Sequence, residues 1–169
     1  MKKLIQLKLK ILAKTILAKY KPEVIGITGS VGKTSAREAV FAVISSKFKA
    51  RQSIKNYNNE IGLPLTVIGA EHPGKSVFGW LRVFLKALWL LIWRDNEYPK
   101  ILILEMGVDR PGDMEYLLNI VKPKVGVFTK IGESHLEFFK SIDEIKEEKF
   151  LLVKNLPKDG YAILNFADE

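Results

Sequence analysis

The sequence has no cysteine and only two histidines among its 169 residues. The lack of cysteine excludes disulfides, thiolate nucleophiles and cysteine-ligated zinc clusters. Two histidines leave little room for a histidine-rich metal site. Hydrophobic residues make up 47% of the chain and charged residues 27%, the usual balance of a globular domain. The length suits one well-packed α/β domain and hardly two.

Acidic residues are missing from the first 22 positions, where seven lysines precede Glu23. The rest of the chain holds 20 basic and 19 acidic residues, so the net charge of +8 arises almost entirely from this tail. Because the basic residues gather in one segment without a recognised module, we expect no nucleic-acid partner.

The same segment lacks glycine and proline up to Tyr20 and is rich in leucine, isoleucine, alanine and lysine. This composition predicts a basic N-terminal helix over residues 1–22. Lys8 and Lys10 interrupt the apolar stretch that a secretory signal needs. Two interpretations of the helix stay open: it lies on an anionic membrane surface, or it packs on the domain with a solvated face.

No apolar run is both long and uncharged enough to cross a membrane comfortably. The strongest one is residues 80–93, whose only charges are Arg82 and Lys86. This segment predicts a helix. The helix lies either in the core or at a membrane interface, with its three tryptophans at the level of the lipid headgroups.

A glycine-rich turn stands between a predicted strand, residues 24–28, and a predicted helix over residues 35–46. Strand, glycine loop, Lys-Thr and helix form the arrangement that cradles phosphates, because glycines let backbone N–H groups approach an anion. Lys33 would reach the outer phosphates, and the Thr34 hydroxyl would hold Mg²⁺. The loop has the short G-x-x-G-K-T form, with Ile27 where the general pattern has a glycine. The predicted nucleoside triphosphate site comprises Gly29, Ser30, Val31, Gly32, Lys33, Thr34 and Ser35.

Further apolar strands are predicted at residues 101–107, 125–129 and 161–165, and a short one at 49–54. Their alternation with helices indicates an α/β fold, a mostly parallel sheet with helices on both faces, of the P-loop-containing nucleotide hydrolase type. Glu105 stands near the end of one strand. Since ligands of open α/β sheets gather at the carboxyl ends of strands, we predict that Glu105 holds Mg²⁺ or orders its water shell.

Three other polar segments have both a functional and a plain interpretation. Residues 56–66 are predicted as a loop whose asparagines face a polar ligand or form an ordinary turn. His135 follows a strand and is either a metal or phosphate ligand or a surface residue. Lys149 lies on the charged helix predicted at residues 141–153, where a solvated face is the simpler interpretation.

Taken together, these segments resemble the central, ATP-binding domain of the Mur ligases, with the short phosphate loop that this family has. The matching pieces, in family order, are GITGSVGKTS, NYNNEIGLPLT, LEMG with the following RPGDM, IGESHLEFFKS, the Glu-Lys pair at 148–149 and AILN. The resemblance covers residues 23–169. Family members also have a domain for the UDP-sugar and a C-terminal ligase domain, so we expect this sequence to lack both.

The resemblance implies roles for the matched residues. Lys33, His135 and Lys149 would act in catalysis, and Lys149 would be carbamylated, which would turn a cation into an anionic metal ligand. Two Mg²⁺ ions would be bound, with Glu105 bridging them, Thr34 on one and His135 on the other. The remaining assignments are Asn58 and Asn59 toward the substrate and Asn165 near the adenine.

The implied activity is ATP-dependent amide-bond formation in peptidoglycan precursor synthesis. ATP would phosphorylate a carboxylate to an acyl phosphate, and an incoming amine would then displace phosphate, with Lys33 and Mg²⁺ stabilising the transferring group. The implied substrates are a UDP-muramoyl peptide and a D-amino-acid dipeptide, in the cytoplasm or at the inner face of the membrane. Two alternatives stay open: a folylpolyglutamate synthase-like ligase, and a membrane-surface nucleotide-binding module without ligase activity.

Overall fold

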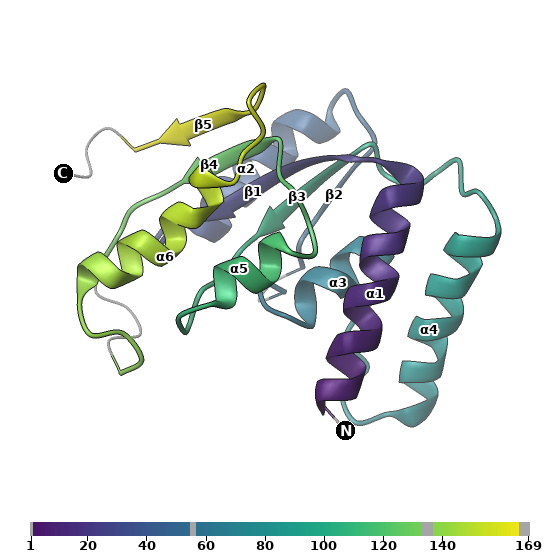
Figure 1. The fold of residues 1–169 in the computed structure, drawn as a ribbon. Coiled ribbons are helices and arrows are strands. Elements are labelled where there is room, and N and C mark those ends of the chain that lie inside the picture. Colours follow the sequence, from purple (N-terminus) through teal and green to yellow (C-terminus); the bar gives the residue numbers. More distant parts are fainter. Residues whose placement is uncertain (1, 55–56, 133–136, 166–169) are drawn as a thin grey trace.

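The computed structural model of the chain describes residues 2–54, 57–132 and 137–165. Its centre is a single five-stranded sheet in the order β2-β3-β1-β4-β5, in which every neighbouring pair is parallel (Figure 1). The strands are β1 (Glu23–Thr28), β2 (Ala50–Gln52), β3 (Ile101–Glu105), β4 (Val125–Phe128) and β5 (Tyr161–Leu164). The predicted parallel α/β fold is therefore confirmed.

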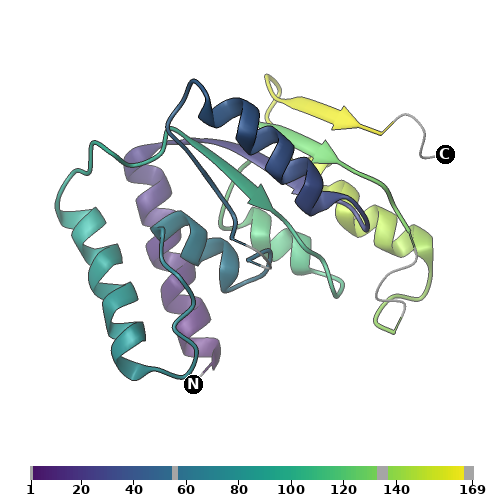
Figure 2. The ribbon, with the colours of Figure 1, turned by 180° about the vertical axis from the view of Figure 1, so that it is seen from behind.

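Helices cover both faces of the sheet, but unequally. Helix α2 (Lys33–Ser45) crosses one face alone, as Figure 2 shows. The other helices lie on the opposite side: α1 (Lys2–Tyr20), α3 (Gly62–Ile68), α4 (Val77–Ile92), α5 (Asp113–Leu118) and α6 (Ile142–Lys154). Apart from α3 and α5, the helices and strands differ from the bounds predicted above only at their ends.

The side chains of β3 alternate between two apolar cores. Ile101 and Ile103 pack with residues of α2, whereas Leu102 and Leu104 join the larger core formed with the other helices. Successive side chains of a strand point to opposite faces, so both faces of β3 are covered. All five of its residues are buried, which explains the unbroken apolar run in the sequence.

The short helix α3 replaces the second half of the loop predicted at residues 56–66. All seven of its residues are buried, so the helix has no polar face by which the sequence could reveal it. Pro64 favoured a loop in the sequence, yet it lies in the first turn, where its missing N–H has no intrahelical acceptor. The prediction was wrong for this part of the chain.

Helix α1 is firmly attached to the domain. Leu9, Ala13 and Ile16 are fully buried in the larger core. The Lys19 ammonium donates to three carbonyl oxygens at the C-terminal end of α4, at 2.8, 2.9 and 2.7 Å. A cation at this position pairs with carbonyl oxygens that have no intrahelical donor and interacts favourably with the helix dipole. One side of α1 is thus packed on the protein. The division of the chain into residues 1–22 and 23–169 stays a prediction.

One side of helix α4 belongs to the core, as one of the two interpretations of residues 80–93 predicts, because Val83, Ala87 and Leu90 are buried. Its other large apolar side chains are mostly exposed. Within the described residues, no helix has the length and apolar character needed to cross a membrane.

Candidate functional site

The glycine-rich turn follows β1 at the carboxyl edge of the sheet, between the strands β3 and β4. Gly29 has φ 143°, and a Cβ at this position would lie 2.0 Å from Thr129 Oγ1. Only glycine fits here. The N–H groups of Ser30 and Val31 donate to the Lys130 carbonyl oxygen at 2.8 and 3.2 Å, which holds the turn against the segment after β4.

Helix α2 begins directly after Gly32, whose φ is 88°. No side chain caps this N-terminus, and its first turn, which includes Thr34 and Ser35, has no acidic residue. The first N–H groups of a helix lack intrahelical acceptors and carry partial positive charge. The start of α2 therefore suits an anion such as a phosphate.

The Lys33 side chain folds back over the turn. Its ammonium donates to the carbonyl oxygens of Gly29 at 2.7 Å and Ser30 at 3.1 Å. Burial lowers the pKa of Lys33, and the carboxylates of Glu105 and Asp109 oppose this shift. The predicted phosphate-binding lysine thus lies at the predicted loop, near two carboxylates.

Glu105 and Thr34, two predicted metal ligands, lie in contact. The Thr34 hydroxyl donates to Glu105 Oε2 at 3.2 Å, and the same oxygen lies 3.3 Å from Arg37 Nη1. The backbone N–H of Glu105 donates to the Ser53 hydroxyl at 3.1 Å. A hydroxyl and a carboxylate side by side are the oxygen ligands that Mg²⁺ prefers.

Lys149 is only 1% exposed, so the interpretation of a solvated helix face was wrong for this residue. Burial and, to a lesser extent, the positive charge of Lys33 lower the pKa of Lys149 to about 8, against the opposing effect of Asp109 and Glu148. The negative charge of Asp109 thus acts on both lysines. The loop lysine, the α6 lysine and the carboxylates after β3 form one electrostatic cluster.

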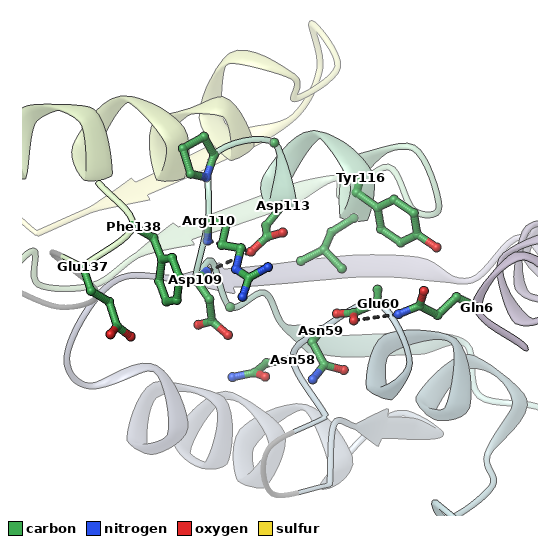
Figure 3. A pocket seen from close by; sticks show the side chains of 14 residues that line it. Gln6, Asn58, Asn59, Glu60, Asp109, Arg110, Asp113, Tyr116, Glu137 and Phe138 are labelled. Carbon is green, nitrogen blue, oxygen red and sulfur yellow. Dashed lines mark hydrogen bonds between the residues drawn. The ribbon is translucent and has the colours of Figure 1, made fainter. Parts of the chain in front are cut away.

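A pocket of about 700 Å³ is lined in part by Asp109 of this cluster (Figure 3). Asn58 and Asn59 come from the segment before α3, and Asp109 and Arg110 come from the loop after β3. The two segments are joined where the Gly107 N–H donates to the Asn58 carbonyl oxygen at 2.8 Å. Both predicted substrate residues therefore line a pocket next to the charged cluster.

Asn59 also has a structural task. Its side-chain oxygen accepts from the N–H groups of Ile61 at 3.2 Å and Gly62 at 3.0 Å, at the start of α3. This satisfies donors that the helix itself cannot pair. Nearby, Gln6 of α1 donates to Glu60 at 2.7 Å, so α1 forms part of the pocket wall (Figure 3).

The last two predicted site residues, Asn165 and His135, are not seen in this cluster. Asn165 follows β5 and lines a separate cavity of about 270 Å³ together with Phe128 and Ile131. His135 lies outside the described residues. Among the residues that are described, no three histidine, aspartate or glutamate side chains gather as a metal group.

Sequence reasoning missed two residues of the cluster, Arg37 and Asp109. Arg37 is 4% exposed on the sheet-facing side of α2, three residues after Thr34. A cation on the otherwise apolar face of that helix was the available signal. Asp109 lies between the LEMG and RPGDM segments. Its position close to the carboxyl end of a strand, where ligands of open α/β sheets bind, was the only signal that it belongs to the site.

Fold and turn together define a P-loop-like α/β domain. A family model, the Mur ligase middle domain, matches residues 90–169. The chain is 32% identical over 90% of its length to the UDP-N-acetylmuramoyl-tripeptide–D-alanyl-D-alanine ligase of Bacillus subtilis (strain 168), covering 28% of that protein. With the ligase of the same name from Rickettsia prowazekii (strain Madrid E), identity is 34% over 86% of this chain and 27% of that protein.

Solved structures agree with these matches. The MurF ligase from Thermotoga maritima in complex with ADP is 30% identical, with a TM-score of 0.74 over 96% of this chain and 32% of that one. MurF from Acinetobacter baumannii, at 24% identity, has the same fold, with a TM-score of 0.75 over 97% of this chain and 31% of that one. The chain is thus similar to the middle part of these Mur ligases and spans less than a third of the length of these relatives.

Proposed function

We propose that the chain is the nucleotide-binding middle domain of an ATP-dependent ligase that joins D-alanyl-D-alanine to a UDP-muramoyl tripeptide in the cytoplasm. The observation that carries this proposal is the assembly around the turn: an uncapped helix N-terminus, a lysine over the turn and a hydroxyl–carboxylate pair beside it. The names of the relatives supply the substrates, and they favour this branch over a folylpolyglutamate synthase-like ligase.

The chain's own residues suggest how the phosphates would be held. The start of α2 would bind the triphosphate, with Lys33 turning from the loop carbonyls to the outer phosphates. Thr34 and Glu105 would hold Mg²⁺, which would neutralise charge on the transferring phosphoryl group. The γ-phosphoryl would pass to the substrate carboxylate, releasing ADP. The dipeptide amine would then attack the acyl phosphate, releasing phosphate and a proton.

Carbamylation of Lys149 and a second Mg²⁺ are finer parts of the proposal. A buried lysine with a lowered pKa holds a larger share of the unprotonated amine that reacts with CO₂. The carbamate would place a negative charge beside Lys33, where the present arrangement has two ammonium groups. His135 would complete the second metal site, and Asn165 would contact the adenine.

The substrate would occupy the pocket lined by Asn58, Asn59 and Arg110. Amide side chains can both donate to and accept from a peptide, and a guanidinium suits a carboxylate or phosphate. Asp109 lies at the junction of this pocket with the lysine cluster, so a carboxylate bound there would approach the γ-phosphoryl group.

The first test is calorimetric titration of the chain with ATP and Mg²⁺, comparing the wild type with Lys33→Ala. We expect Mg²⁺-dependent binding that the substitution abolishes. The matched control is Lys47→Ala, which removes an exposed lysine beyond the end of α2. Equal binding by Lys33→Ala and the wild type would contradict the proposed phosphate site.

A further inference from the structure

Helix α4 presents a continuous apolar surface away from the domain. Its core side is formed by Val83, Ala87 and Leu90, which are at most 4% exposed. The opposite side, hereafter the α4 outer stripe, has side chains that are 46% to 79% exposed. The stripe consists of Phe78, Leu81, Leu85, Leu88, Trp89 and Ile92. An ordinary surface helix has polar residues on that side, so the stripe requires a partner.

The stripe is held rigidly in this orientation. Three carbonyl oxygens at the end of α4 accept from Lys19, and the Tyr20 hydroxyl donates to the Leu90 carbonyl oxygen at 3.0 Å. The core side of α4 is buried at the same time. Rotation of the helix to hide the stripe would break these hydrogen bonds and expose the core side. The outward apolar surface is therefore a fixed feature of the fold.

The charged residues of the two helices at this surface are all positive. Neither α1 nor α4 contains an acidic residue, and the two helices lie side by side (Figures 1 and 2). Arg82 and Lys86 flank the stripe on α4. Helix α1 is also basic, and its Lys10, Lys14 and Lys19 contact the Tyr116 ring, the Asn119 side chain and carbonyl oxygens of α4. The nearest acids in the sequence are Glu71 and Asp95, beyond the two ends of α4. An apolar strip bordered by cations complements an anionic lipid surface.

The tryptophans add a second argument. Trp89 and Trp93 are about half exposed and stand at the C-terminal end of α4. Tryptophan is favoured at the level of lipid headgroups, where its ring meets apolar chains and its N–H meets water. A protein partner would fit the apolar residues equally well, but it gives no reason for two neighbouring helices that both carry basic and no acidic residues.

We propose that the α4 outer stripe docks the protein onto an anionic membrane surface. The helix lies parallel to the membrane plane with its stripe at the boundary between headgroups and acyl chains. The exposed Arg82 beside the stripe faces the acidic headgroups, and the net positive charge of α1 adds long-range attraction. This inference is independent of nucleotide binding, because the stripe contains none of the residues assigned to the phosphate site.

Vesicle flotation tests the proposal. The chain is mixed with phosphatidylcholine vesicles that contain or lack phosphatidylglycerol, at low ionic strength. We expect flotation with the anionic vesicles and a loss of binding as salt is added, since salt screens the cations. The double variant Leu85→Ser/Ile92→Ser should bind about tenfold more weakly, because two side chains no longer enter the apolar layer.

The matched control replaces exposed apolar residues on the other side of the sheet. Val43→Ser/Phe48→Ser changes one residue of α2 and one just after it, 71% and 45% exposed, and should leave vesicle binding unchanged. Brominated lipids provide a local readout. They should quench a larger fraction of the tryptophan fluorescence of the wild type than of a Trp89→Phe/Trp93→Phe variant, in which only Trp80 remains.

Two results would overturn the proposal. One is the failure of the folded wild type to float with anionic vesicles. The other is a dimer in sedimentation velocity that Leu85→Ser/Ile92→Ser dissolves while vesicle binding is unchanged, which would assign the stripe to a second copy of the chain. ATP titration of the same variant separates the two proposals, because its nucleotide binding should equal that of the wild type.

Discussion

Arg37 Nη1 lies 3.3 Å from Glu105 Oε2, and each of these side chains keeps only 5% of its surface exposed. The pair joins α2 to the end of β3 across 68 residues of sequence. Because Thr34 donates to the same carboxylate oxygen, the pair also orients a predicted metal ligand. A buried ion pair adds little net stability, but removing one partner leaves a buried charge without compensation.

Replacing Arg37 with methionine should therefore destabilise the fold strongly. We expect a loss of about 3 kcal/mol in the free energy of unfolding, measured by urea denaturation. Arg37→Met/Glu105→Gln should recover part of this loss, since it removes both charges. The control is Lys49→Ala, which breaks the exposed ion pair with Glu97 and should cost less than about 1 kcal/mol. Similar losses for the buried and exposed pairs would contradict this account.

Gly29→Ala should destroy the phosphate-binding turn. Its Cβ would lie 2.0 Å from Thr129 Oγ1, and the residue has φ 143°, where side chains are strained. We expect lower stability and no measurable ATP binding by calorimetry. Gly74→Ala is the matched control, because Gly74 also has positive φ but its Cβ would meet nothing within 4 Å. Wild-type ATP affinity in Gly29→Ala would be incompatible with the described turn.

The lowered pKa of Lys149 predicts a specific pH dependence of stability. Its value is about 8 in the folded protein against 10.5 for an ordinary lysine, so the unfolded chain binds more protons between these pH values. The free energy of unfolding should therefore rise with pH across this interval. Below pH 8, Lys149 should contribute no pH dependence. Relative to Lys149→Met, the wild type should gain about 3 kcal/mol between pH 8 and 10.5.

This gain is measured by urea unfolding of both proteins in buffer free of CO₂. Parallel curves for the two proteins would show that the Lys149 ammonium is not disfavoured by folding. With added bicarbonate, carbamylation should add the mass of one CO₂ to the intact wild type in native mass spectrometry and leave Lys149→Met unmodified.

Asn59 should stabilise the protein by accepting hydrogen bonds at the start of α3. Asn59→Ala removes the acceptor for the N–H groups of Ile61 and Gly62 and should cost about 1 kcal/mol of stability. Asn59→Asp keeps an acceptor and should restore most of it. Thermal unfolding measures both effects. If Asn59→Ala and Asn59→Asp unfold at the same temperature as the wild type, the capping contact contributes nothing.

The phosphate loop and the strands were predictable because their signals are local. A short apolar run ending in glycines, followed by Lys33 and Thr34, defines strand, turn and helix start within a dozen residues. The parallel sheet followed from the alternation of such runs with helices. Each of these inferences needs only near neighbours in sequence.

The cluster around Glu105 was only partly predictable, because its partners come from distant segments. Arg37 is explained by a carboxylate 68 residues away, and no local pattern reveals that pairing. Lys149 lies in a charged run that resembles an exposed helix face, yet the fold buries it. For α4, the apolar residues surround the helix, so periodicity could not tell which side meets the core.

The position of β1 has a consequence for how the chain acquires its structure. This central strand is formed by residues 23–28, but its hydrogen-bonding neighbours are Ile101–Glu105 and Val125–Phe128. Long-range parallel pairing is slow because a large loop must close before any contact is gained. During synthesis, β1 stays unpaired while more than seventy further residues are made before β3 is complete. We therefore expect chaperones to bind the apolar β1 segment before β3 is available to pair with it.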